Sequence, residues 1–207
     1  MTRPKGGSMS ERPPLDSAKV IATAADVADA EGLDRLTLTR VADVLGVRQP
    51  ALYRHVEGYD DLLRSLSLRG REILAQRLAD ATVGLSGDDA VAALGHAWRQ
   101  VVRDHPGIYA ATDRYPCAGD AELEAAVEGV LAVLGQALRG YDLSDEDLVH
   151  AARALRSAFH GFSHLESGDG HPLPHDPEDT FDHLVQLLCA GIQRLSRKPE
   201  MSTGVVE

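Results

Sequence analysis

Residues 48–55 bring hydrogen-bonding side chains together on one short segment, Arg-Gln-Pro-Ala-Leu-Tyr-Arg-His. Arginine and glutamine can pair bidentately with base edges in the major groove of DNA, and a small methyl group can touch thymine. Only Leu52 and the following Val56 need burial, so the other side chains are free to face outward. The segment therefore has the chemistry of a helix that recognises DNA. An ordinary helical hairpin with a solvated polar face is the alternative, because a bare helix-turn-helix pattern is weakly specific.

The residues before this segment predict a second short helix and a tight turn. Thr37 can accept a hydrogen bond from an unpaired amide of a first helical turn, and apolar residues recur at helical spacing over 41–45. Gly46 suits the left-handed residue that ends a helix, and Val47 can bury the corner. Pro50 falls in the first turn of the next helix, where its missing amide hydrogen costs nothing. The pattern predicts a helix-turn-helix.

Residues 16–66 resemble the DNA-binding domain of the tetracycline-repressor (TetR) family of bacterial transcription regulators. The matching residues are Ala24, Ala25, Ala28, Glu31-Gly32-Leu33, Leu36-Thr37, Val41-Ala42, Leu45-Gly46-Val47, Gln49-Pro50, Ala51-Leu52-Tyr53, Arg54-His55-Val56 and Leu62-Leu63. Two positions depart from the family pattern. Val56 stands where the family usually has an aromatic residue, and Tyr59 stands where it usually has a lysine that contacts a phosphate. Because Tyr59 carries no positive charge, we expect a weaker salt dependence from this position.

The resemblance implies roles for the exposed residues and a partner for them. We expect Gln49, Ala51 and Arg54 to read bases, with double-stranded operator DNA as the partner. A homodimer would read the two half-sites of a palindrome, and repression by blocking a promoter follows from the family. The residues that would hold phosphates or fix the position of the helix are Thr37, Thr39, Arg40, Arg48, Tyr53, His55 and Tyr59, with Pro50 in the same segment.

The charge distribution is compatible with a DNA partner, although the formal net charge of the chain is −11. Residues 1–56 hold 8 Lys and Arg against 7 Asp and Glu, whereas residues 57–207 hold 13 against 25. The acidic residues therefore belong to the rest of the chain, and DNA would be bound through a local set of side chains.

Composition predicts a small cytoplasmic protein without a membrane partner. No apolar run approaches the roughly 18 residues of a membrane span, and residues 1–10 are not followed by the apolar segment of a secretory signal. Cys117 and Cys189 match no disulfide or metal framework, which favours a reducing compartment. The expected organisation is a disordered leader at 1–14, in which Met9 is a candidate natural start, a helix-turn-helix domain at 15–60, a helical ligand-binding and dimerisation domain at 61–197, and a disordered tail at 198–207.

Helical periodicity extends along the whole chain, so we expect an all-α fold of about nine helices, with a three-helix headpiece and a larger helical body. Asp16 should cap the first helix, and Ser144 with Asp147 should open another as a variant capping box. The body helices are expected at about 59–79, 91–105, 119–139, 147–166 and 179–195, with a short helical turn at 108–112 and a long loop at 167–178.

In the TetR family the body encloses a ligand, and the last two long helices pack against a second subunit. The resemblance thus implies a small-molecule effector, apolar or amphipathic, and a homodimer formed by 147–166 and 179–195. Small residues at Ala158, Gly161, Ala190 and Gly191 would allow close approach. Residues 159–161, Phe-His-Gly, resemble a Trp-His-Gly triplet of one family branch. The candidate pocket residues are Trp98, His105, Tyr109, Tyr115, Phe159 and His160, although aromatic residues at helical spacing are more often plain core.

Other functional classes have less support in the sequence. His160 and His164 share one helical face and precede Asp169, His171 and His175, so a metal-responsive regulator is one alternative. A helical interaction module that has lost DNA binding is another. No glycine-rich phosphate loop, nucleophile elbow or Ser/His/Asp order appears, so we expect neither an enzyme nor a bound cofactor.

Overall fold

The structure, a computed structural model, describes residues 14–168 and 170–196. Every regular element among these residues is helical, which confirms the predicted all-α class. The predicted leader at 1–14 lies outside the described residues apart from Pro14, and the predicted tail at 198–207 lies outside them entirely. The elements are α1 (Ser17–Glu31), η1 (Leu33–Arg35), α2 (Leu38–Leu45), η2 (Gln49–Arg54), α3 (Tyr59–Ala81), α4 (Gly87–Asp104), α5 (Pro106–Arg114), α6 (Ala121–Leu138), η3 (Arg139–Tyr141), α7 (Asp145–Ser167) and α8 (Pro177–Ser196).

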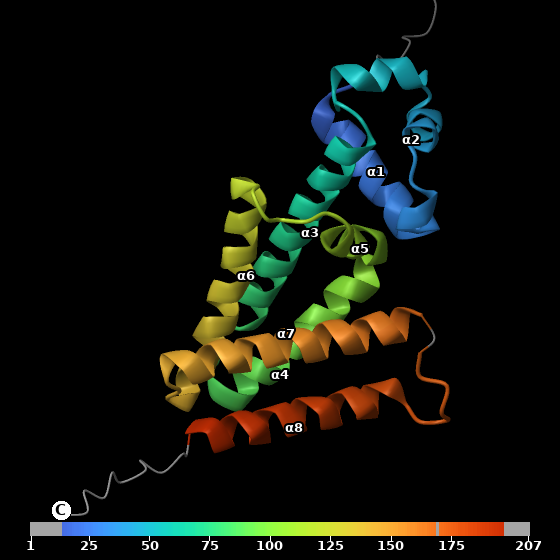
Figure 1. The fold of residues 1–207 in the computed structure, drawn as a ribbon. Helices are drawn as coiled ribbons and strands as arrows, with labels where there is room; N and C mark the ends of the chain where they lie inside the picture. The colour runs from blue at the N-terminus through green and yellow to red at the C-terminus, as the bar shows by residue number, and fades with distance from the viewer. Residues whose placement is uncertain (1–13, 169, 197–207) are drawn as a thin grey trace, which may run out of the picture.

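The helices form a small headpiece and a larger body (Figure 1). α1, α2 and η2 make the headpiece at one end, and α7 and α8 lie side by side across the other end. α3 runs from the headpiece into the body, where it lies beside α6. None of the described helices is long and apolar enough to serve as a membrane span.

Local signals in the sequence account for where several helices begin. The Asp16 side chain accepts a hydrogen bond from the Lys19 amide at 2.7 Å and so caps α1. At the start of α7, Ser144 Oγ accepts from the Asp147 amide at 3.1 Å, as the capping-box pattern predicts. Each cap satisfies an amide that has no partner inside its own helix.

α3 belongs to two hydrophobic cores. Its first turns place Leu62 and Leu66 in the headpiece core, where they meet α1, α2 and Leu52. Its later turns place Leu74 and Leu78 in the body core with α4, α6 and α7. Because one continuous helix is buried at both ends, it ties the headpiece to the body.

The observed elements differ from the predicted ones in two places. Residues 49–54 form a 3₁₀ helix rather than an α-helix, with Ala51 N bonded to Arg48 O at 2.9 Å and His55 N to Leu52 O at 2.8 Å. The segment is only six residues long, and 3₁₀ geometry is used in such short pieces. The helical turn expected at 108–112 is a nine-residue α-helix, α5, that starts at Pro106.

A buried arginine joins α4, α7 and α8. The Arg99 side chain is only 2% exposed, and its guanidinium donates two hydrogen bonds to the Glu166 carboxylate, at 2.9 and 2.7 Å, and one to Glu178 at 2.7 Å. The guanidinium also lies over the rings of Phe162 and Phe181, 5.4 and 4.9 Å from their centroids. The Arg99 guanidinium holds the pKa of Glu166 down to about 2.

Replacing Arg99 with methionine tests the contribution of this cluster. Because the change leaves two carboxylates beside the apolar core, we expect the free energy of unfolding at neutral pH to fall by about 3 kcal/mol. Arg103→Met, which removes a partner of Glu166 that is 44% exposed, should cost less than about 1 kcal/mol. Denaturant unfolding monitored by circular dichroism measures both changes.

The pH dependence distinguishes an ionic contribution from lost packing. Since the folded-state pKa of Glu166 lies below its ordinary value of 4.5, its ion pairs stabilise the fold above that pH and are lost as the pH falls toward 2. The difference in stability between the wild type and Arg99→Met should therefore shrink on acidification. A constant difference would show that packing alone is responsible.

Candidate DNA-binding surface and effector cavity

The helix-turn-helix corner forms where the sequence predicts it. Thr37 Oγ1 accepts a hydrogen bond from the Arg40 amide at 3.0 Å and caps α2. Gly46 ends α2 with φ 68° and ψ 34°, a left-handed conformation that costs glycine little. The Val47 amide then bonds back to Ala42 O at 3.0 Å and closes the turn. The corner fixes η2 against the headpiece core.

A chain of side-chain hydrogen bonds crosses the surface between α2 and η2. Thr39 Oγ1 donates to Gln49 Oε1 at 2.9 Å, and Gln49 Nε2 donates to Tyr53 Oη at 3.1 Å. Both ends of the Gln49 amide are therefore held in a fixed orientation before any ligand binds. A side chain that is already ordered loses less conformational freedom on binding.

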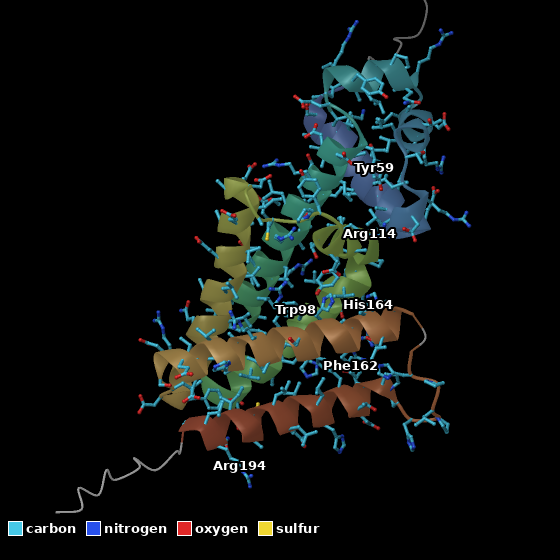
Figure 2. All side chains as sticks on the ribbon, viewed as in Figure 1. Tyr59, Trp98, Arg114, Phe162, His164 and Arg194 are labelled. Atoms are coloured by element: carbon cyan, nitrogen blue, oxygen red, sulfur yellow. The ribbon has the colours of Figure 1, made fainter. Side chains whose placement is uncertain are left out.

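The structure leaves most of the predicted DNA-contacting residues accessible to solvent. Leu52 and Val56 face the core, 0% and 3% exposed, as predicted. Tyr53 is 52% exposed, and Figure 2 labels Tyr59 where α3 leaves the headpiece. The exposed members of the predicted set are Thr37, Thr39, Arg40, Arg48, Pro50, Tyr53, Arg54 and Tyr59, and the half-buried members are Gln49, Ala51 and His55.

Arg40 differs from the other arginines of this surface because it already has an acidic partner. Its guanidinium donates to the Glu31 carboxylate through Nε at 2.9 Å and Nη2 at 2.6 Å. This hydrogen bonding lowers the pKa of Glu31. Contact of Arg40 with a phosphate would have to compete with Glu31, whereas neither Arg48 nor Arg54 has an ion pair within the described residues.

The headpiece meets the body through a backbone contact between α1 and α5. A Cβ atom on Gly107 would lie 2.0 Å from the carbonyl carbon and oxygen of Ala28, so only glycine allows the two helices to approach this closely. Asp29, next along α1, accepts the amide of Ile108 at 2.8 Å and contacts His105 Nδ1 at 3.0 Å. One carboxylate thus binds the first turn of α5. Neither Asp29 nor Gly107 was identified from the sequence.

A cavity of about 60 Å³ lies inside the body, between α3, α4, α5, α6 and α7. Three of the six predicted pocket residues line it, namely Trp98, Tyr109 and His160. The other lining residues are Arg71, Leu74, Thr112, Asp113, Val127, Val130, Leu131 and Arg156. The volume is well below the roughly 300–1,000 Å³ of pockets that enclose drug-sized ligands. A ligand of that size would extend beyond this cavity or require the helices to part.

Hydrogen bonds connect the three predicted residues that line the cavity. Trp98 Nε1 donates to Tyr109 Oη at 2.9 Å, and Tyr109 Oη lies 2.8 Å from His160 Nδ1. Because the indole nitrogen of Trp98 can only donate, the Tyr109 hydroxyl accepts that bond and donates its own hydrogen to His160 Nδ1. A neutral His160 then carries its hydrogen on Nε2, which lies 3.8 Å from Asp113 Oδ2. Burial raises the pKa of Tyr109, which keeps this phenol protonated.

The other three predicted pocket residues lie elsewhere. His105 contacts Asp29 at the junction between headpiece and body. Tyr115 packs against the headpiece core. Phe159 is fully buried in the body core beside Phe181, with ring centroids 5.9 Å apart. The sequence could not separate core from cavity, because both favour aromatic residues at helical spacing.

Two arginines of the cavity were not identified from the sequence, although α3 carries a signal for one of them. Arg71 occupies a position of the apolar face, since Ser67, Leu74 and Leu78 at helical spacing from it are all buried. A charge at a core-facing position indicates a specific role or partner. Arg156 on α7 is exposed and gives no such signal.

The histidines proposed as metal ligands are not brought together. The rings of His160 and His164 stack with centroids 6.0 Å apart, while His171 lies against Phe162 and His175 is exposed. Asp169 lies outside the described residues. Within residues 14–168 and 170–196, three potential ligands converge only at His96, Glu178 and Asp182, all exposed.

α7 and α8 expose one continuous face. On α8 the exposed residues recur at helical spacing and include Leu187, which is 72% exposed, with Ala190 and Gly191. Figure 2 labels Arg194 on the same outer side. On α7, Gly161 has no neighbouring atom within 4 Å of an added Cβ, and Gly191 has none either. These glycines leave room that no other described residue occupies.

Replacing Gly107 with alanine tests the contact between α1 and α5. Because the methyl group would meet backbone rather than a movable side chain, we expect a loss of about 1–3 kcal/mol in the free energy of unfolding. Gly129→Ala is the control, since Gly129 in α6 has open space around it and alanine favours helix by up to about 1 kcal/mol. Thermal and denaturant unfolding measure both variants; equal stability in both would contradict the close approach.

Comparison with known proteins agrees with this arrangement. Residues 91–188 match the family model described as "Tetracyclin repressor-like, C-terminal domain". The chain is 34% identical over 197 residues to the uncharacterized HTH-type transcriptional regulator Rv0681 of Mycobacterium tuberculosis, covering 93% of this chain and 90% of that protein. It is 28% identical over 186 residues to the uncharacterized HTH-type transcriptional regulator YobS of Bacillus subtilis, covering 89% and 96%.

A solved structure shares the fold. The transcriptional regulator SCO7222, a TetR protein from Streptomyces coelicolor, superposes with a TM-score of 0.66 at 18% identity, over 89% of this chain and 100% of that one. With a helix-turn-helix headpiece, a repressor-like body and a relative aligned over nearly its whole length, the chain belongs to the TetR family of transcription regulators.

Proposed function

We propose that this regulator is a homodimer that binds a palindromic operator and is released from it by a small molecule. The observation that carries the proposal is the ordered surface of η2. There Gln49 is held between Thr39 and Tyr53, and Arg48 and Arg54 are exposed and form no ion pair with any described residue. The DNA-binding domain is assigned to about 15–60 and the effector and dimerisation domain to about 61–197. Since its partner is genomic DNA, the protein is placed in the cytoplasm.

Each side chain of the surface is assigned a role by its position. Gln49, Ala51 and Arg54 read bases in the major groove, which admits a helix of this size. Arg48 and Tyr53 hold phosphates on either side. The position of η2 is fixed by Thr37, Thr39, Pro50 and His55. Tyr59 donates a single hydrogen bond to a phosphate. Arg40 contacts DNA only when its ion pair with Glu31 is broken.

Arg54→Ala tests the assignment on the operator recovered by selecting the purified protein against randomised duplex DNA. We expect binding to weaken by about 1–3 kcal/mol, because a bidentate or phosphate contact is lost. Arg77→Ala is the matched control: Arg77 is also exposed, but it lies near the far end of α3. Fluorescence anisotropy at a fixed salt concentration measures both.

Two outcomes of this experiment would reject parts of the proposal. If Arg54→Ala and Arg77→Ala bind the operator equally well, Arg54 does not contact the DNA. If the selection enriches no sequence at all, the chain is an interaction module that keeps the fold without reading DNA.

The exposed face of α7 and α8 is assigned to the dimer. Its leucine and small residues, Leu187, Ala190, Gly191 and Gly161, have the composition of a closely packed helix interface. A second copy related by a two-fold axis would place the same residues opposite them and form a four-helix bundle. The headpieces would then point in the same direction, as two half-sites on one DNA duplex require.

Leu187→Glu tests this interface. We expect the dimer dissociation constant to rise at least about tenfold, because each subunit would bury an unpaired carboxylate. Val83→Glu is the control, since Val83 is 78% exposed in the turn after α3 and belongs to neither α7 nor α8. Sedimentation velocity measures the distribution of monomer and dimer. A dimer that survives Leu187→Glu at low protein concentration would place the interface elsewhere.

The effector is assigned to the cavity that Trp98, Tyr109 and His160 line. A ligand there changes DNA binding only if it binds one arrangement of the headpieces more tightly than another. α3 and α5 both line the cavity and both contact the headpiece, so these two helices transmit the difference. His105, Tyr115 and Phe159 are not in contact with the cavity in this arrangement and act, if at all, after the helices move.

A further inference from the structure

The cavity contains a buried cation that forms no ion pair with an acidic residue in the described part of the chain. Arg71 is 9% exposed, and its guanidinium donates to the carbonyl and hydroxyl oxygens of Ser67 and to the Thr112 carbonyl at 2.8 Å. All of these acceptors are neutral. Burial lowers the pKa of Arg71, which shows that its surroundings disfavour the charge. A buried charge is normally paired, so this site lacks a negative charge.

A second arginine reaches the same cavity from α7. Arg156 lines the cavity and has no hydrogen bond or ion pair to any described residue. Its positive charge also lowers the pKa of Arg71, so the two guanidinium groups are close enough to repel each other. Two cations held near each other from different helices stabilise an anion placed between them.

The acidic groups of the cavity do not neutralise this charge. Asp113 is the one carboxylate among the lining residues, and its Oδ2 lies 3.8 Å from His160 Nε2. It acts on Arg71 more weakly than Arg156 does. The cavity therefore keeps an excess positive charge.

The lining of the cavity also includes apolar residues. Leu74 of α3 is buried, while Val127, Val130 and Leu131 of α6 form a row along one helix. Leu131 is 42% exposed and marks the outer end of this row. The hydrogen-bonding groups of Trp98 and Tyr109 are already paired with each other.

We propose that the effector is an amphipathic anion, a carboxylate attached to an apolar chain. Arg71 and Arg156 hold the carboxylate, and the apolar chain lies along Leu74 and the valine and leucine residues of α6. This assignment rests on the proposed function of the cavity and adds the chemical class of its ligand. A volume of about 60 Å³ admits the head group, and the chain follows the apolar row toward the exposed Leu131.

The experiment uses the full-length protein and its own fluorescence. Trp98 is the single tryptophan of the chain and lines the cavity, so its emission reports binding there. The probes are the carboxylates from butanoate to octanoate, each compared with the alcohol and the alkylammonium ion of the same chain length. We expect each carboxylate that binds to do so at least about tenfold more tightly than its alcohol, as a charged hydrogen-bonded pair provides.

Matched arginine variants separate the cavity from general charge. Arg156→Gln should weaken carboxylate binding about tenfold and leave alcohol binding nearly unchanged. Arg153→Gln, which changes an exposed arginine of the same helix that does not line the cavity, should leave both unchanged. Because Arg156 is exposed, its replacement leaves the hydrophobic core intact. Arg71→Gln provides a second test if that variant folds.

Three results would overturn the assignment: carboxylates that bind no better than the alcohols, alkylammonium ions that bind best, or equal losses in Arg156→Gln and Arg153→Gln. The same preparations are tested for release of the selected operator. If neutral or cationic probes release the protein from the operator, the proposal of a ligand-responsive regulator is supported and only the anionic effector is rejected. Failure to bind any operator would instead reject the proposed function.

Discussion

The position of the headpiece relative to the body depends on the contact between Gly107 of α5 and Ala28 of α1. Without a side chain at 107, the two helices approach until backbone meets backbone, and Asp29 then reaches the amide of Ile108. α3 also crosses between headpiece and body, but a single helix joining two cores can bend or rotate. The second contact, through α5, removes that freedom and gives the headpiece a defined orientation.

This junction explains why the headpiece core includes residues from outside the predicted domain. Ile108 and Ala111 of α5 are buried together with Leu62 and Leu66 of α3 and with α1. The headpiece core therefore extends past residue 60, and the domain boundary near that residue stays a prediction. Any movement of α5 in the body must therefore change the surface on which α1 rests.

The all-α class, the helix-turn-helix and its capping residues could be predicted because they depend on local patterns. Thr37, Gly46, Asp16 and Ser144 each act within a few residues of their own position, where sequence spacing decides the geometry. The 3₁₀ form of residues 49–54 could not be read from the same pattern, because apolar spacing over six residues fits either helix type.

The cavity was harder to predict because it depends on contacts between distant residues. Arg71, Thr112 and Arg156 come from three helices, and only the packing of those helices places them around one space. Periodicity identified Trp98, Tyr109 and His160 as polar-tipped aromatic residues, but gave Phe159 the same status although it is plain core. Asp29 and His105, which are 76 residues apart, show the same limit.

The excess of acidic residues in the body consists largely of carboxylates that form ion pairs between helices and carboxylates on the exposed surface. Arg64 of α3 binds Asp120 and Glu122 at the start of α6, and Arg99 binds Glu166 and Glu178. At these two places an arginine is paired with acidic residues of another body helix. Arg71 differs from both, because it is buried without an ion pair to any described residue, and this difference is the basis on which we assign the cavity to a negatively charged ligand.

α5 connects that cavity to the headpiece in a few turns. Thr112, near its end, accepts the hydrogen bond from Arg71, while Gly107 and Ile108, near its start, rest on α1. A nine-residue helix is about 13 Å long and moves as a rigid rod. If an anion draws the Arg71 guanidinium away from the Thr112 carbonyl, that end of α5 loses its anchor, and the helix can shift only by changing its contact with Ala28. The contacts at the two ends of α5 therefore hold the headpiece in place in the free protein. They also form the shortest route by which a ligand could release the headpiece.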